Sequence, residues 1–101
     1  MYKGLFMDIQ VSANVITISG NIKSVSDYQK IKSEIDKVVT TQKEIRINIP
    51  DSISIISSVI GYFNKLIMKD KIVLNMSVGN ACLMELLEEL NLKSLFNVSK
   101  V

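Results

Sequence analysis

The chain has no histidine, so it lacks the side chain that proteins use most often as a general base and as a metal ligand. It has one cysteine, Cys82, which cannot form a disulfide within the chain. Cys82 lies within an apolar helical pattern, and we therefore expect a buried, unreactive thiol. This sparing use of cysteine suits the cytoplasm.

Long hydrophobic runs are also missing. Hydrophobic residues make up 48% of the 101 residues, which is enough to build the core of one domain spanning residues 1–101. No apolar run approaches the roughly 20 residues that cross a bilayer. Asp8 comes too early for the apolar part of a signal peptide. We expect a soluble, cytoplasmic protein that does not insert into a membrane.

The chain lacks an excess of one charge. Its 12 basic and 10 acidic residues leave a net charge of +2, whereas nucleic-acid binding usually needs a concentrated basic face. Three neighbouring lysines, Lys65, Lys69 and Lys71, are interrupted by Asp70 and have no aromatic residues interleaved with them. They are typical of a solvated surface, and we expect no nucleic-acid partner.

Groups of catalytic residues are absent as well. Cys82 has no paired base, and the neighbouring Glu88 and Glu89 would point in different directions on a helix. No phosphate-binding glycine loop and no nucleophile elbow occurs. The sequence therefore predicts a protein that is not an enzyme and that needs no cofactor or metal.

Two periods of hydrophobicity alternate along the chain. A period of two marks strands and a period of three to four marks amphipathic helices. Residues 5–11 and 15–19 alternate and predict a β-hairpin, with Asn14 suited to the turn. Further strands are expected at 44–49, ended by Pro50, and at 71–76.

Three helices are expected between these strands. The first carries a stripe that runs from Val25 to Val39 and begins at a serine cap, Ser24 or Ser26. The second runs from Ser57-Ser58 to near Lys69-Asp70. The third begins at the cap Asn80, buries Leu83, Leu86, Leu87 and Leu90, and ends at Asn91 in a left-handed conformation. Leu95, Phe96 and Val98 form a closing strand or a docked tail.

This order predicts an α/β fold with a mixed sheet of four to five strands and three helices. Strands that alternate with helices favour parallel neighbours, and the initial hairpin adds an antiparallel pair.

Residues 46–61 read R-I-N-I-P-D-S-I-S-I-I-S-S-V-I-G. This stretch resembles, without a gap, the central motif of STAS domains, V-L-D-L-S-G-V-x-F-I-D-S-S-G-L-G. Residues 75–96 resemble the C-terminal helix of the family and its Leu-x-x-Leu-Phe ending, through Leu92 and Leu95-Phe96 among others. The order of elements agrees over the rest of the chain. The resemblance implies a STAS-like fold of the anti-sigma-factor-antagonist type.

The resemblance also implies a mechanism. In partner-switching STAS proteins, the first serine of Asp-Ser-Ser-Gly is phosphorylated by a serine kinase that is also an anti-sigma factor. By position this serine is Ser57, and Ser58 is the second choice. A helix N-terminus accommodates an anionic phosphate, and a charge of about −1.5 to −2 within an apolar interface would release a partner.

Two positions depart from the family motif. Ile56 stands where the family has aspartate, and Val59 stands where it has glycine. One alternative is therefore that Ser57 or Ser58 only caps the second helix. A second alternative is a constitutive STAS subunit of a larger signalling or transport complex that is not phosphorylated.

The loop before the second helix is the expected partner-binding surface. Neighbouring side chains of an extended segment alternate in direction, so Ile53, Ile55 and Ile56 cannot all point inward. An exposed apolar patch there would mark a protein contact, whereas an ordinary loop would place these residues in the core. The predicted contact residues are Ile53, Ser54, Ile55, Ile56, Ser57, Ser58 and Val59.

Overall fold

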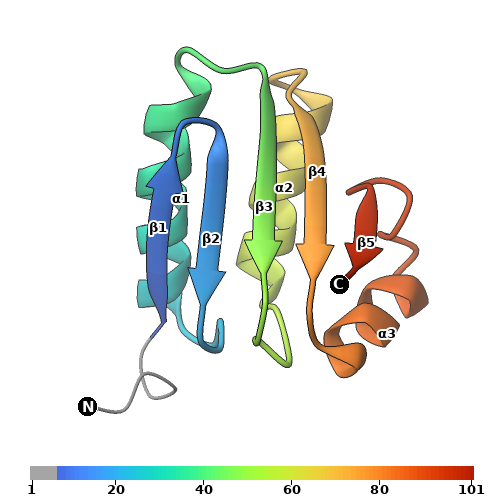
Figure 1. Cartoon of the computed structure of the whole chain (residues 1–101). Helices are drawn as coiled ribbons and strands as arrows, with labels where there is room; N and C mark the ends of the chain where they lie inside the picture. Colours follow the sequence, from blue (N-terminus) through green and yellow to red (C-terminus); the bar gives the residue numbers. More distant parts are fainter. Residues whose placement is uncertain (1–6) are drawn as a thin grey trace.

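The computed structural model describes residues 7–101, which form three helices and one five-stranded sheet (Figure 1). The elements are β1 (Asp8–Ser12), β2 (Val15–Ser19), α1 (Val25–Val39), β3 (Glu44–Ile49), α2 (Ser57–Met68), β4 (Val73–Val78), α3 (Ala81–Glu89) and β5 (Val98–Lys100). The predicted α/β class with an initial hairpin is confirmed, and the sheet has the larger of the two expected strand numbers.

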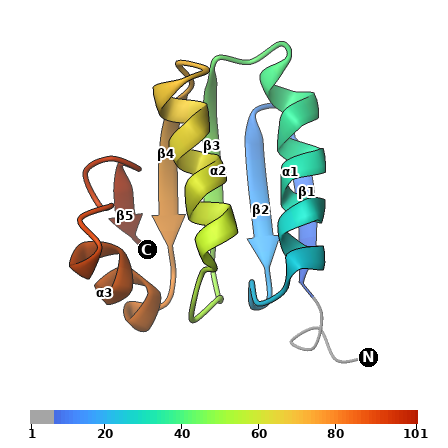
Figure 2. The same cartoon turned by 180° about the vertical axis from the view of Figure 1, so that it is seen from behind.

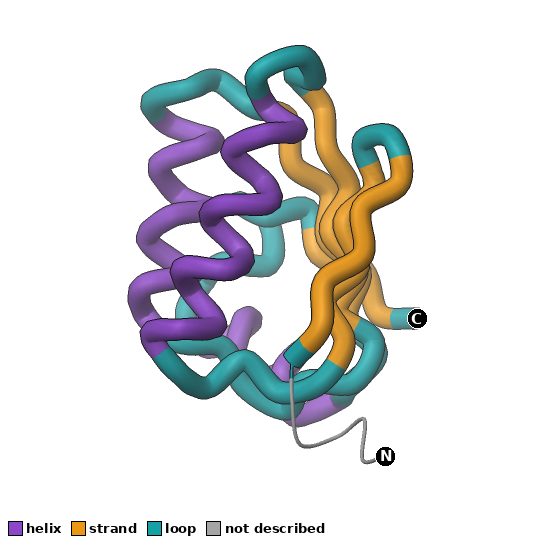
Figure 3. Tube along the Cα trace, turned by 90° about the vertical axis from the view of Figure 1, so that its left-hand side faces the viewer, coloured by secondary structure: helices purple, strands orange, loops and turns teal. Residues whose placement is uncertain are grey.

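The strands lie in the order of the sequence, β1-β2-β3-β4-β5. β1 and β2 are antiparallel, and each later pair is parallel. Each helix therefore connects one parallel strand to the next strand along the sheet, always in the direction from β2 to β5. Because such connections are right-handed, they place their helices on the same face of the sheet. Figures 2 and 3 show α1 and α2 side by side on that face, and Figure 2 shows α3 at the β4–β5 end.

The core lies between the sheet and the helices. One row of side chains crosses the whole sheet in register, and apart from the half-exposed Val11 its members are buried. The row consists of Val11, Ile16, Ile47, Met76 and Val98. The helices contribute Ile31, Ile35, Phe63, Leu66, Leu83 and Leu87 to the same core.

The opposite face of the sheet is polar. The neighbouring row runs through Gln10, Thr17, Asn48, Ser77 and Ser99. Arg46 extends over this face and donates a hydrogen bond from Nη1 to the hydroxyl oxygen of Ser77 at 3.1 Å. A sheet covered on one face only is expected to alternate in this way.

Two of the three helices begin with a side-chain cap. Ser24 Oγ accepts from the backbone N–H of Asp27, and the Asp27 carboxylate accepts from the N–H of Ser24, which completes a capping box. Asn80 Oδ1 accepts from the N–H groups of Cys82 and Leu83. Of the two predicted caps for the first helix, Ser24 is the one observed, and the predicted cap Asn80 is confirmed. Asn91 has a φ of 59° as expected after α3.

A polar contact joins α1 to α2. The Tyr62 hydroxyl donates to Asp36 Oδ1 at 2.6 Å, and Lys32 Nζ lies 2.8 Å from Asp36 Oδ2. Burial and the hydrogen bond to Asp36 raise the pKa of Tyr62 well above its usual value. Partial burial alone would raise the pKa of Asp36, but the hydrogen bonds from Lys32 and Tyr62 outweigh it and hold that pKa below its usual value.

Several predicted boundaries shift. The strand expected at 71–76 is β4, Val73–Val78, because Lys71 takes a left-handed conformation (φ 58°) and the N–H of Ile72 bonds to Leu66 O at 2.9 Å. Lys71 and Ile72 thus belong to the turn that closes the C-terminus of α2 rather than to the strand. The first strand was expected to include residues 5 and 6, which lie outside the described residues. In the hairpin turn the positive φ of 54° falls on Ala13 rather than Asn14.

Cys82 is exposed, so the prediction of a buried thiol is wrong. The third helix lies at the edge of the sheet and buries only Leu83 and Leu87, a narrower stripe than the sequence predicts. Leu90 is 47% exposed for the same reason. Val25, at the first position of α1, is 63% exposed, although it belongs to the apolar stripe in the sequence.

Within residues 7–101 no helix has both the length and the apolar character that a membrane span requires. Over the same residues, cysteine and acidic side chains form no group of three that could hold a metal ion.

Candidate functional site

Three loops meet at the carboxyl ends of the parallel strands, the lower edge in Figure 1. They follow β2, β3 and β4, and each leads into the N-terminus of a helix. In open α/β sheets ligands bind outside the carboxyl ends of the strands, usually where the strand order reverses, and the parallel strands of this sheet show no such reversal. The predicted site, residues 53–59, lies in the loop after β3 and the first turn of α2.

Side-chain hydrogen bonds fix the loop after β3 to the loop after β2. Both loops supply donors and acceptors, although about 30 residues separate them in the sequence. The three bonds run from Gly20 N to Asp51 Oδ1 (2.7 Å), from Ile22 N to Ser52 Oγ (3.1 Å) and from Ile53 N to Asn21 Oδ1 (3.0 Å). We call these three bonds the loop clamp.

Ser52 is the buried centre of the loop clamp. Its side chain is fully buried, and its hydroxyl accepts from Ile22 N while donating to Ser54 O at 2.7 Å. A buried polar group needs hydrogen-bond partners, and the Ser52 hydroxyl finds one in each of the two loops. The loop after β4 packs against the same segment, because a Cβ on Gly79 would lie 2.1 Å from Pro50 O. Only glycine fits there.

The seven predicted contact residues divide by burial. Ile55 and Val59 lie in the core. Ser54 and Ile56 are half-buried, whereas Ser57 and Ser58 are exposed. Ile53 is 55% exposed, among the more exposed large apolar side chains of residues 7–101. The three isoleucines therefore do not all point inward, and a protein could touch Ile53, Ile56, Ser57 and Ser58 directly.

The first turn of α2 differs from those of α1 and α3. Its N-cap is Ile56, and no side chain of residues 7–101 caps it. Ser57 and Ser58 lie inside the helix and do not cap it, so the capping alternative is wrong. Its first turn has no acidic side chain, which is also true of α3 but not of α1, where Asp27 lies in the first turn. Ile56 occupies the position where an aspartate would both cap the helix and neutralise its partial positive charge.

The sequence did not identify two members of the site, Asn21 and Asp51. Each is a polar loop residue, and nothing in its neighbourhood along the chain shows which backbone N–H it binds. The pairing depends on β2 and β3 lying side by side in the sheet. A Gly-Asn pair directly after a strand is typical of a turn, but it does not show which residue the asparagine binds.

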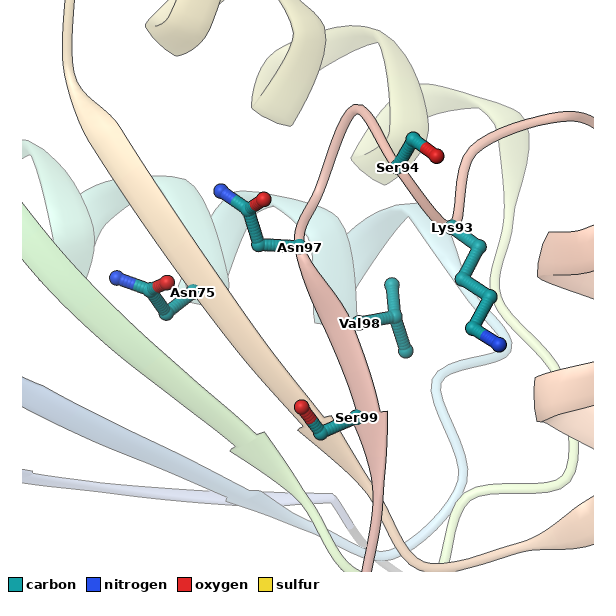
Figure 4. A pocket seen from close by; sticks show the side chains of 6 residues that line it. All are labelled: Asn75, Lys93, Ser94, Asn97, Val98 and Ser99. Carbon is teal, nitrogen blue, oxygen red and sulfur yellow. The ribbon is translucent and has the colours of Figure 1, made fainter.

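A shallow polar hollow of about 500 Å³ lies beside β5 (Figure 4). Its side chains do not converge, because Asn97 and Ser99 lie on one side of the strand and Lys93 on the other. Two of them already have partners in the fold. Asn97 Nδ2 donates to Leu74 O at 2.9 Å, and Lys93 Nζ lies 3.4 Å from Glu88 Oε2. The side chains of this hollow therefore do not form a binding site, and the better candidate is the group of loops at the carboxyl ends of the parallel strands.

Comparison with protein-family models gives no match, and comparison with curated proteins gives none either.

Proposed function

We propose that this chain is a STAS-like, non-enzymatic cytoplasmic regulator that binds a protein partner of the anti-sigma-factor and serine-kinase type. The contact surface consists of Ile53, Ile56 and the first turn of α2. Phosphorylation of Ser57, or less favourably of Ser58, releases the partner. One observation carries the proposal: an exposed helix start with no side-chain cap from the described residues lies four residues after the exposed Ile53, on a loop that is clamped in place.

The charges around Ser57 support the phosphorylation step. The first turn of α2 has neither a side-chain cap nor an acidic residue, so a phosphate there would meet a partial positive charge and no like charge from that turn. The folded chain could therefore carry the phosphate without rearranging. A partner that covers Ile53 and Ser57 would have to desolvate about −1.5 to −2 charges, which is costly.

Gly61 supports a contact along the same face. It lies one turn after Ser57 on the exposed side of α2, and a Cβ there would meet no atom of the described residues within 4 Å, apart from its neighbours and the backbone of its own helix. Glycine inside a helix costs about 0.8–1.0 kcal/mol relative to alanine. Nothing within the described chain requires glycine at this position, whereas a partner that approaches the helix backbone closely would.

The second candidate is a constitutive STAS subunit of a larger signalling or transport complex. Ile56 favours it, because the phosphorylation motif lacks its acid at that position. The two candidates differ in one respect. A switch predicts that a negative charge at position 57 removes the partner, whereas a fixed subunit predicts that it does not.

Affinity capture from the native cell tests both candidates. The wild-type chain is captured and its Ser57–Ser58 peptide is analysed by mass spectrometry, in parallel with Ser57→Ala and Ser57→Asp. Ser33→Asp is the matched control, because Ser33 is also exposed and lies on α1 away from the loop. We expect a kinase-type partner with the wild type and with Ser57→Ala, and its loss with Ser57→Asp only.

Two results would contradict parts of the proposal. Equal capture by Ser57→Asp and the wild type, with no phosphate on either serine, would favour the constitutive subunit. Capture of no specific protein by any variant would remove the partner-binding function itself.

A further inference from the structure

Ile53 is held by a residue outside its own loop. Its backbone N–H donates to Asn21 Oδ1 at 3.0 Å, and Asn21 lies 32 positions earlier, in the loop after β2. Ile53 is also the most exposed apolar side chain of the proposed contact surface. One bond therefore connects the loop after β2 directly to the residue that a partner would meet first.

The neighbouring residues already fix the path of the chain through this loop. Ser52, on one side of Ile53, is fully buried and bonded to two backbone groups. Ile55, two residues further on, lies in the core. The bonds of the loop clamp to Asp51 and Ser52 thus already hold the loop, and the third bond, from Ile53 N to Asn21 Oδ1, acts mainly on Ile53 itself. It restricts the peptide unit of Ile53, and with it the direction of an exposed side chain.

We propose that Asn21 is a positioning residue, which fixes the orientation of Ile53 before the partner binds. This inference rests on the proposed function and adds the loop after β2 to the machinery of that site. A contact residue that is ordered in advance loses less conformational entropy on association, and the affinity gains by that difference. Asn21 acts through its side-chain oxygen and need not touch the partner.

The chain offers a conservative variant and a matched control. Asn21→Ala removes the acceptor, whereas Asn21→Asp keeps an oxygen at the same position. Asn14 also bonds to the backbone, at the opposite end of the sheet and as a donor rather than an acceptor, from Nδ2 to Glu44 O at 2.9 Å. Asn14→Ala therefore loses one side-chain-to-backbone hydrogen bond of similar length, far from the proposed surface.

The first measurement is amide hydrogen exchange of the purified chain, followed at Ile53 by NMR. We expect exchange about three- to tenfold faster in Asn21→Ala, and wild-type exchange in Asn21→Asp and Asn14→Ala. An unchanged rate in Asn21→Ala would overturn the inference, because Asn21 would then not order Ile53.

The second measurement is the Kd for the purified protein that the wild-type chain captures from its cell. We expect Asn21→Ala to raise Kd about three- to tenfold and Asn21→Asp to restore it, with Asn14→Ala at the wild-type value. A purely structural role would lower the stability of the fold and leave the Kd of the folded protein unchanged, and that result would overturn the inference.

A further variant, Ile53→Ser, separates this inference from the proposed function. If Ile53→Ser binds as tightly as the wild type, the partner does not contact this loop and the proposed surface is wrong. If Ile53→Ser weakens binding and Asn21→Ala does not, the surface stands and only the role of Asn21 is wrong.

Discussion

Replacing Gly61 by alanine should make this protein more stable. Gly61 is the fifth residue of α2 and is exposed. Apart from its neighbours and the backbone of its own helix, the added Cβ would have no atom of the described residues within 4 Å. The substitution therefore brings no clash and no strain. It removes the backbone freedom that glycine has in the unfolded chain, and it improves the helix propensity at an interior position.

The expected gain is about 0.8–1.0 kcal/mol in the free energy of unfolding. A chain of 101 residues has an unfolding entropy of roughly 0.2 kcal/mol/K, so this gain corresponds to about 4–5 °C in Tm. The assay is urea unfolding followed by circular dichroism, with Tm from a thermal scan of the same variants. The denaturant slope should not change, because the variant exposes the same surface on unfolding.

Gly79→Ala is the matched control with the opposite sign. Its Cβ would lie 2.1 Å from Pro50 O, a backbone atom that cannot move without shifting the end of β3. We expect a loss of about 1–3 kcal/mol or more. If Gly61→Ala leaves the free energy of unfolding unchanged or lowers it, the argument that a Cβ at position 61 fits without strain is wrong. Gly61→Ala that is more stable yet binds the captured partner less tightly would place the partner on this face of α2.

Three further predictions concern the fold. Ser24→Ala should lower the free energy of unfolding by about 1 kcal/mol in urea titrations, because it removes the cap of α1, and an unchanged value would mean that water replaces the cap. The contact between Tyr62 and Asp36 should make stability depend on pH. The lowered pKa of Asp36 gives stability that is lost as pH falls below about 4, and the raised pKa of Tyr62 gives stability that is lost as pH rises above about 10. Unfolding of Tyr62→Phe at a series of pH values should lack the alkaline decrease due to this tyrosine. Cys82 should react with a thiol reagent in the native protein at a rate close to that in urea, and protection in the native state would contradict its exposure.

The sequence by itself determined the elements and the faces that they bury. The alternation of Ile45, Ile47 and Ile49 gave a strand with one buried side, and all three side chains are fully buried. The cap Asn80 followed from the residue type before its helix, and the cap of α1 was limited to Ser24 or Ser26, of which Ser24 is the one observed. These features depend on residues within a few positions of one another, so a short stretch of sequence is enough to predict them.

The tertiary structure alone decided how wide the buried stripe of each helix is. The pattern of α3 placed Cys82 and Leu90 in or near the core, yet both are exposed because this short helix packs at the edge of the sheet. The start of β4 was decided in the same way. Lys71 and Ile72 have strand-like neighbours, but they are used to close the C-terminus of α2.

The candidate site shows the same division. The sequence located the loop and showed that its isoleucines could not all be buried, but it could not tell which of them is exposed. Ile53 is exposed whereas Ser52 and Ile55 are buried, and the chain bends at Ile53, so the strict alternation of an extended segment does not apply here. The bond from Ile53 to Asn21 could not be read from the sequence, because it joins two loops that meet only after β2 and β3 pair in parallel.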